Sequence, residues 1–273
     1  MNKDKMTQQV TTNSQPLPFQ GQKWLVEERD ACGVGFIAYK DGRAAHSIVA
    51  QAVTALGCME HRGGCSADRD TGDGSGIMAS LPVKIFEQWF ESQGKTLPPQ
   101  ESWGVGMVFM HLEEEKYQAE KAFVEATIAK HGLTVEGWRV VPINPGVLGE
   151  QAKENQPRIE QVVVTSPEGL TGDELDRRLY IARSEVGKRL DDFFYICSFS
   201  CRTVVYKGMV RANVLSEFYQ DLTNPDYEAT FALYHRRFST NTMPKWPLAQ
   251  PMRMLGHNGE INTLLGNINW MAS

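Results

Sequence analysis

The chain has 273 residues, of which 41% are hydrophobic and 22% are charged, and its formal net charge is −5 at pH 7. An acidic chain argues against a nucleic-acid partner, because phosphate binding needs a basic face. No apolar run approaches the roughly 18 residues that a membrane-spanning helix requires, so the sequence predicts a soluble protein of one large domain or two modest ones.

The cysteines of the chain are five in number, and an odd count does not make a disulfide framework. This usage predicts a reducing, cytoplasmic setting. The five positions are Cys32, Cys58, Cys65, Cys197 and Cys201.

Residues 1–31 are polar, rich in Gln and Thr, and contain two prolines. They lack the apolar core of a secretory signal, and their acidic residues argue against an organellar transit peptide. One interpretation is a disordered tail. The other is a short propeptide whose end is set by the chemistry at Cys32.

Hydrophobic periodicity divides the first half of the chain into alternating strands and helices. Strands are predicted at 36–39, 77–81, 103–112 and 135–141, and helices at 44–57, 83–92 and 113–130. Inward-facing side chains are expected at Val105, Met107 and Phe109 of the third strand and at Ala122, Phe123 and Ala126 of the third helix. A loop rich in Asp and Gly separates the first helix from the second strand.

The second half begins with a Pro- and Gly-rich loop that extends to Pro157. Thr171 and Glu174 form a capping box, which predicts a helix from there to about Leu190. Strands are predicted at 159–165, 193–200, 202–207 and 229–235, with a short helix at 213–222. The first of these strands is expected to be buried on both faces because of its β-branched run. Strands, helices and strands again predict an α+β fold in which two sheets pack face to face between helices.

Cys32 stands directly before a glycine and a strand-like apolar run. A thiol at the start of a buried strand, after a dispensable leader, is typical of a self-processed N-terminal nucleophile. The alternative is an inert core cysteine, because free cysteine is among the most buried residue types. The adjacent residues alone favour the core interpretation.

The last part of the chain carries the side chains best suited to bind a substrate. Arg236 and Arg237 end a predicted strand, and arginine offers a rigid fork that matches a carboxylate. Asn258 and Gly259 offer a side-chain amide beside an accessible backbone N–H, as an oxyanion hole requires. The alternative is an exposed loop followed by an Asn-Gly turn.

Metal and nucleotide sites are not assigned. The glycine-rich run at 71–76 matches neither common nucleotide-binding pattern. Asp68, Asp70 and Asp73 resemble a calcium loop in composition but not in spacing. The cysteine pairs lack zinc-ribbon spacing.

Five motifs in one order resemble the class II glutamine amidotransferase domain of the glutamate synthase large subunit. The loop at 64–68 is similar to that of the ferredoxin-dependent type. The motifs occupy 32–35, 60–64, 71–77, 235–242 and 257–260.

The resemblance implies an N-terminal-nucleophile hydrolase fold, an αββα sandwich over 32–273, and removal of residues 1–31. Cys32 would attack the amide of glutamine, and Asn258 with the Gly259 N–H would stabilise the oxyanion. Its free α-amino group would be the general base, because a pKa of about 7.7–8.0 suits a thiol of about 8.5. Arg237 would hold the α-carboxylate of the substrate, with Arg236 as its competitor. Neighbouring strand residues face opposite ways, so only one arginine is expected in the site.

The resemblance also implies partners for a longer enzyme. These are L-glutamine, a synthase domain that adds ammonia to 2-oxoglutarate, FMN, an iron–sulfur cluster, and ferredoxin or an NADPH-oxidising small subunit. A carboxylate that binds the substrate's α-amino group has no matching position here, so the fold is expected to be incomplete at its C-terminus and the isolated chain nearly inactive. The location would be the cytoplasm, or the stroma in a plastid-bearing organism. Alternatives are another class II amidotransferase, such as an amidophosphoribosyltransferase or asparagine synthetase domain, and a non-catalytic remnant.

Overall fold

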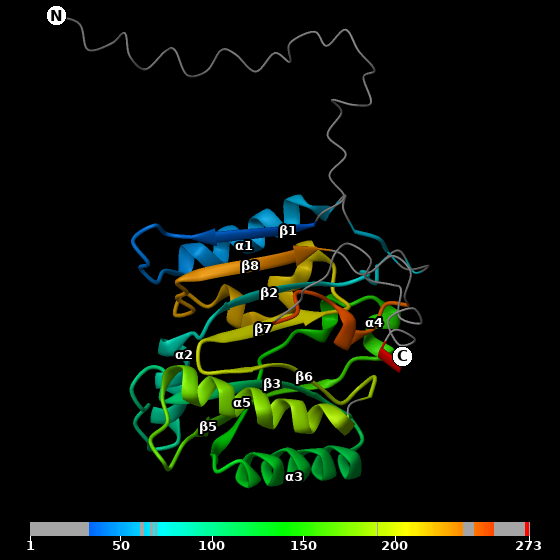
Figure 1. The fold of residues 1–273 in the computed structure, drawn as a ribbon. Coiled ribbons are helices and arrows are strands. Elements are labelled where there is room, and N and C mark those ends of the chain that lie inside the picture. Colours follow the sequence, from blue (N-terminus) through cyan, green and yellow to red (C-terminus); the bar gives the residue numbers. More distant parts are fainter. Residues whose placement is uncertain are drawn as a thin grey trace, which may run out of the picture. The chain divides into compact units, whose positions relative to one another are not determined.

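In the described part of the chain, the strands form two antiparallel sheets of four strands each (Figure 1). The computed structural model describes residues 33–60, 63–65, 68, 70–189, 191–236, 243–253 and 271–272. The first sheet has the order β1 (Val34–Ala38), β8 (Phe231–Arg236), β2 (Ser75–Ser80), β7 (Thr203–Gly208). The second has the order β4 (Thr134–Val140), β5 (Arg158–Thr165), β3 (Trp103–Met110), β6 (Tyr195–Ser200).

Strand β3 shows how the two sheets share a core. All eight of its residues are buried. Val105, Met107 and Phe109 belong to the larger core that also contains residues of the first sheet, whereas Val108 and Met110 belong to a second core. The period of two therefore places one face of β3 toward the first sheet and the other toward helices, as the sequence predicts.

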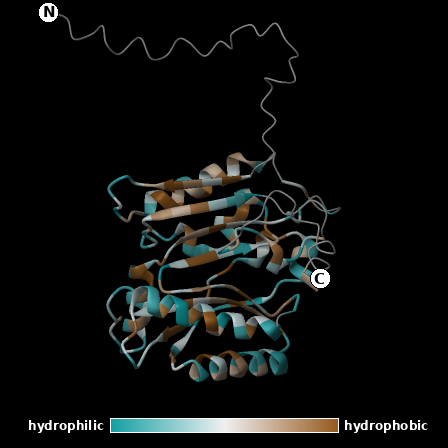
Figure 2. Cartoon of the chain, in the orientation of Figure 1, coloured by the Kyte–Doolittle hydropathy of each residue, from teal (hydrophilic) through white to brown (hydrophobic). Residues whose placement is uncertain are grey.

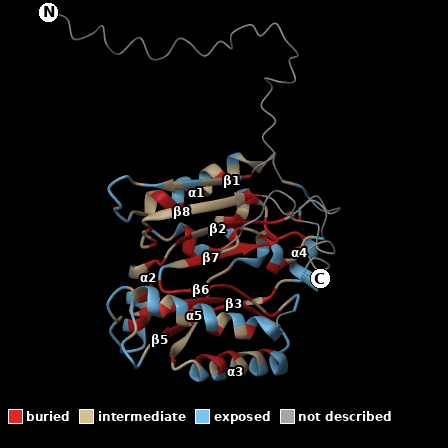
Figure 3. Cartoon of the chain, in the orientation of Figure 1, coloured by how far each residue is buried: buried red, intermediate tan, exposed pale blue. Residues whose placement is uncertain are grey.

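The helices complete the layers on either side. Helices α3 (Glu114–Lys130) and α5 (Gly172–Val186) bury apolar side chains with the second core, and α1 (His46–Cys58) packs along β8 and β1. Helix α2 (Val83–Ser92) has the predicted bounds. Figures 2 and 3 show apolar, buried strands inside and polar, exposed helix faces outside. The layered α+β sandwich is confirmed.

The inward face predicted for α3 is wrong. Ala122 and Ala126 are exposed, and Phe123 is half-buried. The buried residues are Tyr117, Val124, Thr127 and Ile128. The buried face is therefore rotated to the side that carries Val124 and Ile128, and on it the hydroxyl of Tyr117 donates to the buried carboxylate of Glu160 on β5 at 2.8 Å.

The capping box predicted at the start of α5 does not form. Thr171 occupies the N-cap position, but its side chain makes no capping hydrogen bond. Gly172 has φ of 55°, in the left-handed region, so the first turn departs from the geometry that the box requires. Helix α5 ends at Val186, and a 3₁₀ turn over Gly187–Arg189 follows it.

Two other segments differ from the prediction in their secondary structure. The Pro- and Gly-rich loop contains a short helix, α4 (Glu150–Glu154). The helix predicted at 213–222 is three short pieces, with α6 (Leu215–Phe218) between two 3₁₀ turns. Strands β6 and β7 are consecutive but lie in different sheets, so their connection joins the two layers. In the part of the chain that is described, no helix is long and apolar enough to cross a membrane.

Candidate active site

Strands β1 and β8 bring two sequence motifs together at one end of the first sheet. Gly33 follows Cys32 in the chain and precedes β1, while Arg236 ends β8. The backbone N–H of Arg236 donates to the carbonyl oxygen of Gly33 over 2.5 Å. The antiparallel pairing therefore places Gly33, which follows Cys32 in the chain, beside Arg236, which precedes Arg237.

The side chain of Arg236 is fully buried and contacts two carboxylates. Its Nη1 lies 2.6 Å from Oδ1 of Asp73, and its Nη2 lies 3.4 Å from Oε1 of Glu60. Nη1 also lies 3.4 Å from the carbonyl oxygen of Gly74. Glu60 belongs to the motif at 60–64 and Asp73 to the motif at 71–77, so one guanidinium joins three of the five motifs.

Hydrogen bonds to Asp68 fix the acidic loop. Its Oδ1 accepts from the Thr71 N–H at 2.8 Å, and its Oδ2 accepts from the Thr71 hydroxyl at 2.5 Å. The hydrogen bond from the Thr71 hydroxyl, and after it the one from the Thr71 N–H, hold the pKa of Asp68 well below its usual range. The Thr71 hydroxyl accepts in turn from the N–H of Ala152 in α4 at 3.2 Å. The loop therefore rests on α4. Within the described ranges, no group of three or more His, Cys, Asp or Glu could hold a metal ion.

The segment 243–253 precedes the motif that contains Asn258 and Gly259, and large side chains anchor it. Trp246 is 1% exposed, and its Nε1 donates to the carbonyl oxygen of Ala152 at 3.2 Å. Arg253 forms an ion pair with Asp176 of α5. These contacts hold the segment 243–253, which precedes Asn258 and Gly259 in the chain, against α4 and α5.

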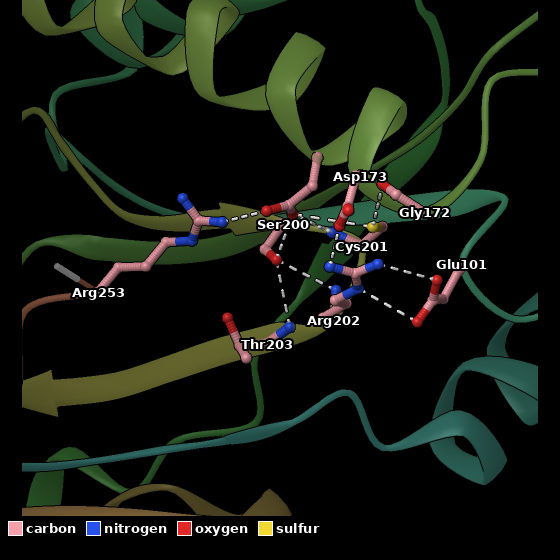
Figure 4. Close-up of polar contacts among 9 residues, drawn as sticks. Glu101, Gly172, Asp173, Ser200, Cys201, Arg202, Thr203 and Arg253 are labelled. Carbon is pink, nitrogen blue, oxygen red and sulfur yellow. Dashed lines mark hydrogen bonds and ion pairs between the residues drawn. The ribbon is translucent and has the colours of Figure 1, made fainter.

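The carboxylate of Asp176 also organises the turn between β6 and β7. It accepts from the hydroxyl of Ser200 at 2.6 Å and from the backbone N–H of Cys201 at 3.1 Å. Figure 4 shows Arg253 on one side of Ser200 and Arg202 on the other. Arg202 forms ion pairs with Glu101 at 3.1 Å and with Asp173 at 2.5 Å.

Lys207 of β7 is a buried cation beside the same segment. Its Nζ donates to the carbonyl oxygen of Pro247 at 2.7 Å and lies 3.4 Å from Sδ of Met252. It also lies 4.8 Å from the centre of the Tyr195 ring. Burial lowers the pKa of Lys207 to about 8. No carboxylate of the described residues forms a salt bridge with it.

We expect Lys207 to make stability rise with pH between about 8 and 10.5, its folded and unfolded pKa values. In this window the unfolded chain binds a proton that the folded chain does not, so the free energy of unfolding increases with pH and the gain is absent below pH 8. The full shift corresponds to roughly 3 kcal/mol. Urea unfolding of the wild type and Lys207→Met at two pH values spanning this window measures it. From the lower to the higher pH, the free energy of unfolding of the wild type should increase relative to that of Lys207→Met. A difference between the two proteins that does not change with pH would contradict the lowered pKa of Lys207.

The described cysteines differ in exposure and acidity. Cys58 and Cys65 are exposed, whereas Cys197 and Cys201 are buried. Burial raises the pKa of both buried thiols to about 12. Because the thiolate is the nucleophile, these two are poor nucleophiles at neutral pH.

The predicted site residues are only partly covered by the structure. Cys32, Arg237, Asn258 and Gly259 lie outside the described residues, and Arg236 lies within them. The sequence did not single out Asp176, Lys207 or Arg253 as supports of the site. Their partners lie far away in the chain, 77 residues for the ion pair of Arg253, so no local pattern marks them.

Comparison with known proteins defines the class. The family model described as glutamine amidotransferases class-II matches residues 32–273. The chain therefore belongs to the class II glutamine amidotransferases, and the layered fold is consistent with their N-terminal-nucleophile hydrolase architecture.

Among curated proteins, the chain is similar to ferredoxin-dependent glutamate synthases. It is 64% identical over 264 residues to ferredoxin-dependent glutamate synthase 2 of Synechocystis sp., covering 97% of this chain and 17% of that protein. It is 49% identical over 276 residues to the ferredoxin-dependent glutamate synthase of Pyropia yezoensis, covering 98% of this chain and 17% of that protein. The chloroplastic enzyme of Oryza sativa is 49% identical over 254 residues, covering 91% and 16%. The chain thus spans about a sixth of the length of these relatives.

Proposed function

We propose that the chain is a glutaminase domain that hydrolyses L-glutamine to glutamate and ammonia, with Cys32 as its nucleophile. The observation that carries the proposal is the contact between Gly33 and Arg236 within a class II amidotransferase fold. This contact brings the start of β1 to the end of β8, so that the Cys-Gly motif and the arginine motif converge.

The proposed reaction begins when residues 1–31 are removed, because the base is the α-amino group of Cys32. This amine accepts the thiol proton, and the sulfur attacks the side-chain amide carbon of glutamine. The amide of Asn258 and the N–H of Gly259 stabilise the tetrahedral oxyanion, and one such donor is worth ~10²–10³ in rate. The protonated amine then transfers its proton to the departing ammonia. Water hydrolyses the γ-glutamyl thioester to glutamate.

Arg237 is the arginine that we propose for the α-carboxylate of the substrate. Its competitor, Arg236, is fully buried and already engaged by Asp73 and Glu60. Transferring that guanidinium to a substrate would leave two protein carboxylates without their cation, which is costly in a buried site. The burial of Arg236 therefore supports Arg237.

The fate of the ammonia, the cofactors, the electron donor and the location in the cell are also proposals. We propose that the ammonia is transferred to 2-oxoglutarate by a synthase domain in a longer protein, and that FMN and an iron–sulfur cluster belong to parts that this chain does not include. The names of the ferredoxin-dependent relatives support ferredoxin as the electron donor over an NADPH-oxidising subunit. The chloroplastic enzyme of Oryza sativa supports a chloroplast location for a chain from a plant, and we propose the cytoplasm for a chain from an organism without plastids.

A diazo ketone analogue of glutamine tests the proposed nucleophile. We expect one covalent adduct per chain, located at Cys32 by peptide mapping, and no adduct in the Cys32→Ser variant. Cys65→Ser is the matched control, because Cys65 is exposed and its loss should not change the labelling. A wild-type chain that does not react would favour the non-catalytic alternative.

A further inference from the structure

Arg236 is joined to the neighbour of Cys32 through its backbone. Its N–H donates to the carbonyl oxygen of Gly33, and a Cβ atom on Gly33 would lie 1.9 Å from the carbonyl oxygen of Arg236. The two backbones therefore approach more closely than any side chain would allow at Gly33. Contacts that fix the position of Arg236 therefore also fix the position of Gly33.

The guanidinium of Arg236 is held by two loops. Asp73 and Glu60 supply the carboxylates, and Gly63 supplies the space. A Cβ atom on Gly63 would lie 2.0 Å from Cζ of Arg236, so the loop at 60–64 lies directly against the guanidinium. Glycine at position 63 leaves room for the guanidinium, whereas glycine at position 33 lets the chain approach the backbone of Arg236.

The cluster is not built for stability alone. Among the residues that the structure describes, Nε of Arg236 and Oε2 of Glu60 are both buried and have no hydrogen-bond partner. Buried polar atoms are rarely left unpaired, and each unpaired group costs stability. Among the described residues, the buried pair of Arg139 with Asp221 has no such unpaired side-chain atom. The Arg236 cluster thus carries a cost in stability, and it is joined to Gly33 through the backbone of Arg236, which supports a role in the site.

We propose that Arg236 is a positioning residue, which acts with Asp73 and Glu60 to fix Gly33 and so the backbone on which the Cys32 nucleophile is carried. This inference rests on the proposed function, because it concerns the same nucleophile. In this proposal Arg236 acts through Gly33 and not by touching the substrate or the reacting atoms. Weakening the ion pairs of Arg236 lets the start of β1 shift. A small displacement of the nucleophile slows its reaction with an aligned glutamine analogue more than its reaction with a small alkylating reagent.

The test compares two labelling rates at Cys32 in the full 273-residue chain. One reagent is the diazo ketone analogue of glutamine, which requires an aligned site, and the other is iodoacetamide, which requires only an accessible thiol. We expect Asp73→Asn to lower the ratio of the two rates at least ~10-fold. Asp221→Asn is the matched control, because it also weakens a buried arginine–carboxylate pair but lies in another part of the fold, and its ratio should equal that of the wild type.

Further variants separate positioning from folding. Glu60→Gln, at a half-exposed side chain, should fold and lower the ratio to a smaller extent. Arg236→Lys keeps the charge and should retain more of the ratio than Arg236→Met. Equal ratios in Asp73→Asn, Glu60→Gln and the wild type would overturn the positioning role while leaving the nucleophile intact. A wild type that iodoacetamide alkylates at Cys32 but the diazo ketone does not would instead overturn the proposed function, and this inference with it.

Discussion

Replacing Asp221 with alanine is expected to lower the free energy of unfolding by about 3–5 kcal/mol, the cost of breaking a buried ion pair by removing one partner. The carboxylate is 2% exposed and receives both Nη atoms of Arg139, at 2.7 and 2.8 Å. It also accepts from the hydroxyl of Tyr206 at 2.9 Å. Burial, and then Asp221 itself, raises the pKa of Tyr206 well above its usual range, so this hydroxyl remains a donor. The substitution leaves the Arg139 cation buried without its carboxylate.

Urea unfolding followed by fluorescence measures this loss. The control is Glu228→Ala, which removes an ion pair of similar length, 2.8 Å to Lys84, from an exposed position. Exposed pairs contribute about 0–1 kcal/mol, so the control should remain close to the wild type. Similar losses in the two variants would show that burial does not govern the strength of these pairs.

The second large effect is expected from Trp246→Ala, again about 3–5 kcal/mol, because it removes a large buried side chain and leaves a cavity. The indole packs against Phe109 at 6.0 Å and Phe218 at 5.6 Å between ring centres. Its close approach to Gly208, where a Cβ atom would lie 2.3 Å from the ring, shows how tightly β7 covers it. Its loss should therefore release the segment 243–253 as well as lower stability.

Thermal unfolding together with limited proteolysis tests both consequences. Trp246→Ala should unfold at a lower temperature and become sensitive to cleavage within 243–253. Leu248→Ala, in the same 3₁₀ turn but 41% exposed, serves as the control and should do neither. Cleavage of the variant elsewhere in the chain, with this segment still protected, would contradict the anchoring role of Trp246.

The layers could be predicted because their signals are local. Helix α2 has an apolar face at helical spacing and a proline before it, and the predicted bounds agree with the observed ones. The β-branched run of β5 correctly predicted burial on both faces. The alternation of β3 predicted one inward face, whereas all eight of its residues are buried. The errors arose where one local pattern competed with tertiary contacts. At Thr171 the left-handed conformation of Gly172 is incompatible with the capping box. In α3 the buried face is the one that packs Val124 and Ile128 into the second core.

Within the described residues, the sequence motifs point to Arg236 as a site candidate but not to its pairing with Asp73 and Glu60. The strand pattern alone does not choose between the adjacent Arg236 and Arg237, whereas the resemblance favours Arg237. The burial of Arg236 supports the same proposal, and it depends on Asp73 and Glu60, which lie 163 and 176 residues away from Arg236 in the chain. The depressed pKa of Lys207 depends in the same way on burial by a distant segment. Such properties arise only when the sheet brings loops of different motifs together.

Intact-mass spectrometry of the purified chain tests the central claim, that Cys32 becomes an N-terminal nucleophile. We expect the mass of a chain that begins at Cys32, and a further increase equal to one glutamine-analogue adduct after treatment with the diazo ketone. The Cys32→Ala variant should keep the mass of the chain that begins at Met1 and gain no adduct. A wild-type chain that retains residues 1–31 and gains no adduct would contradict the account.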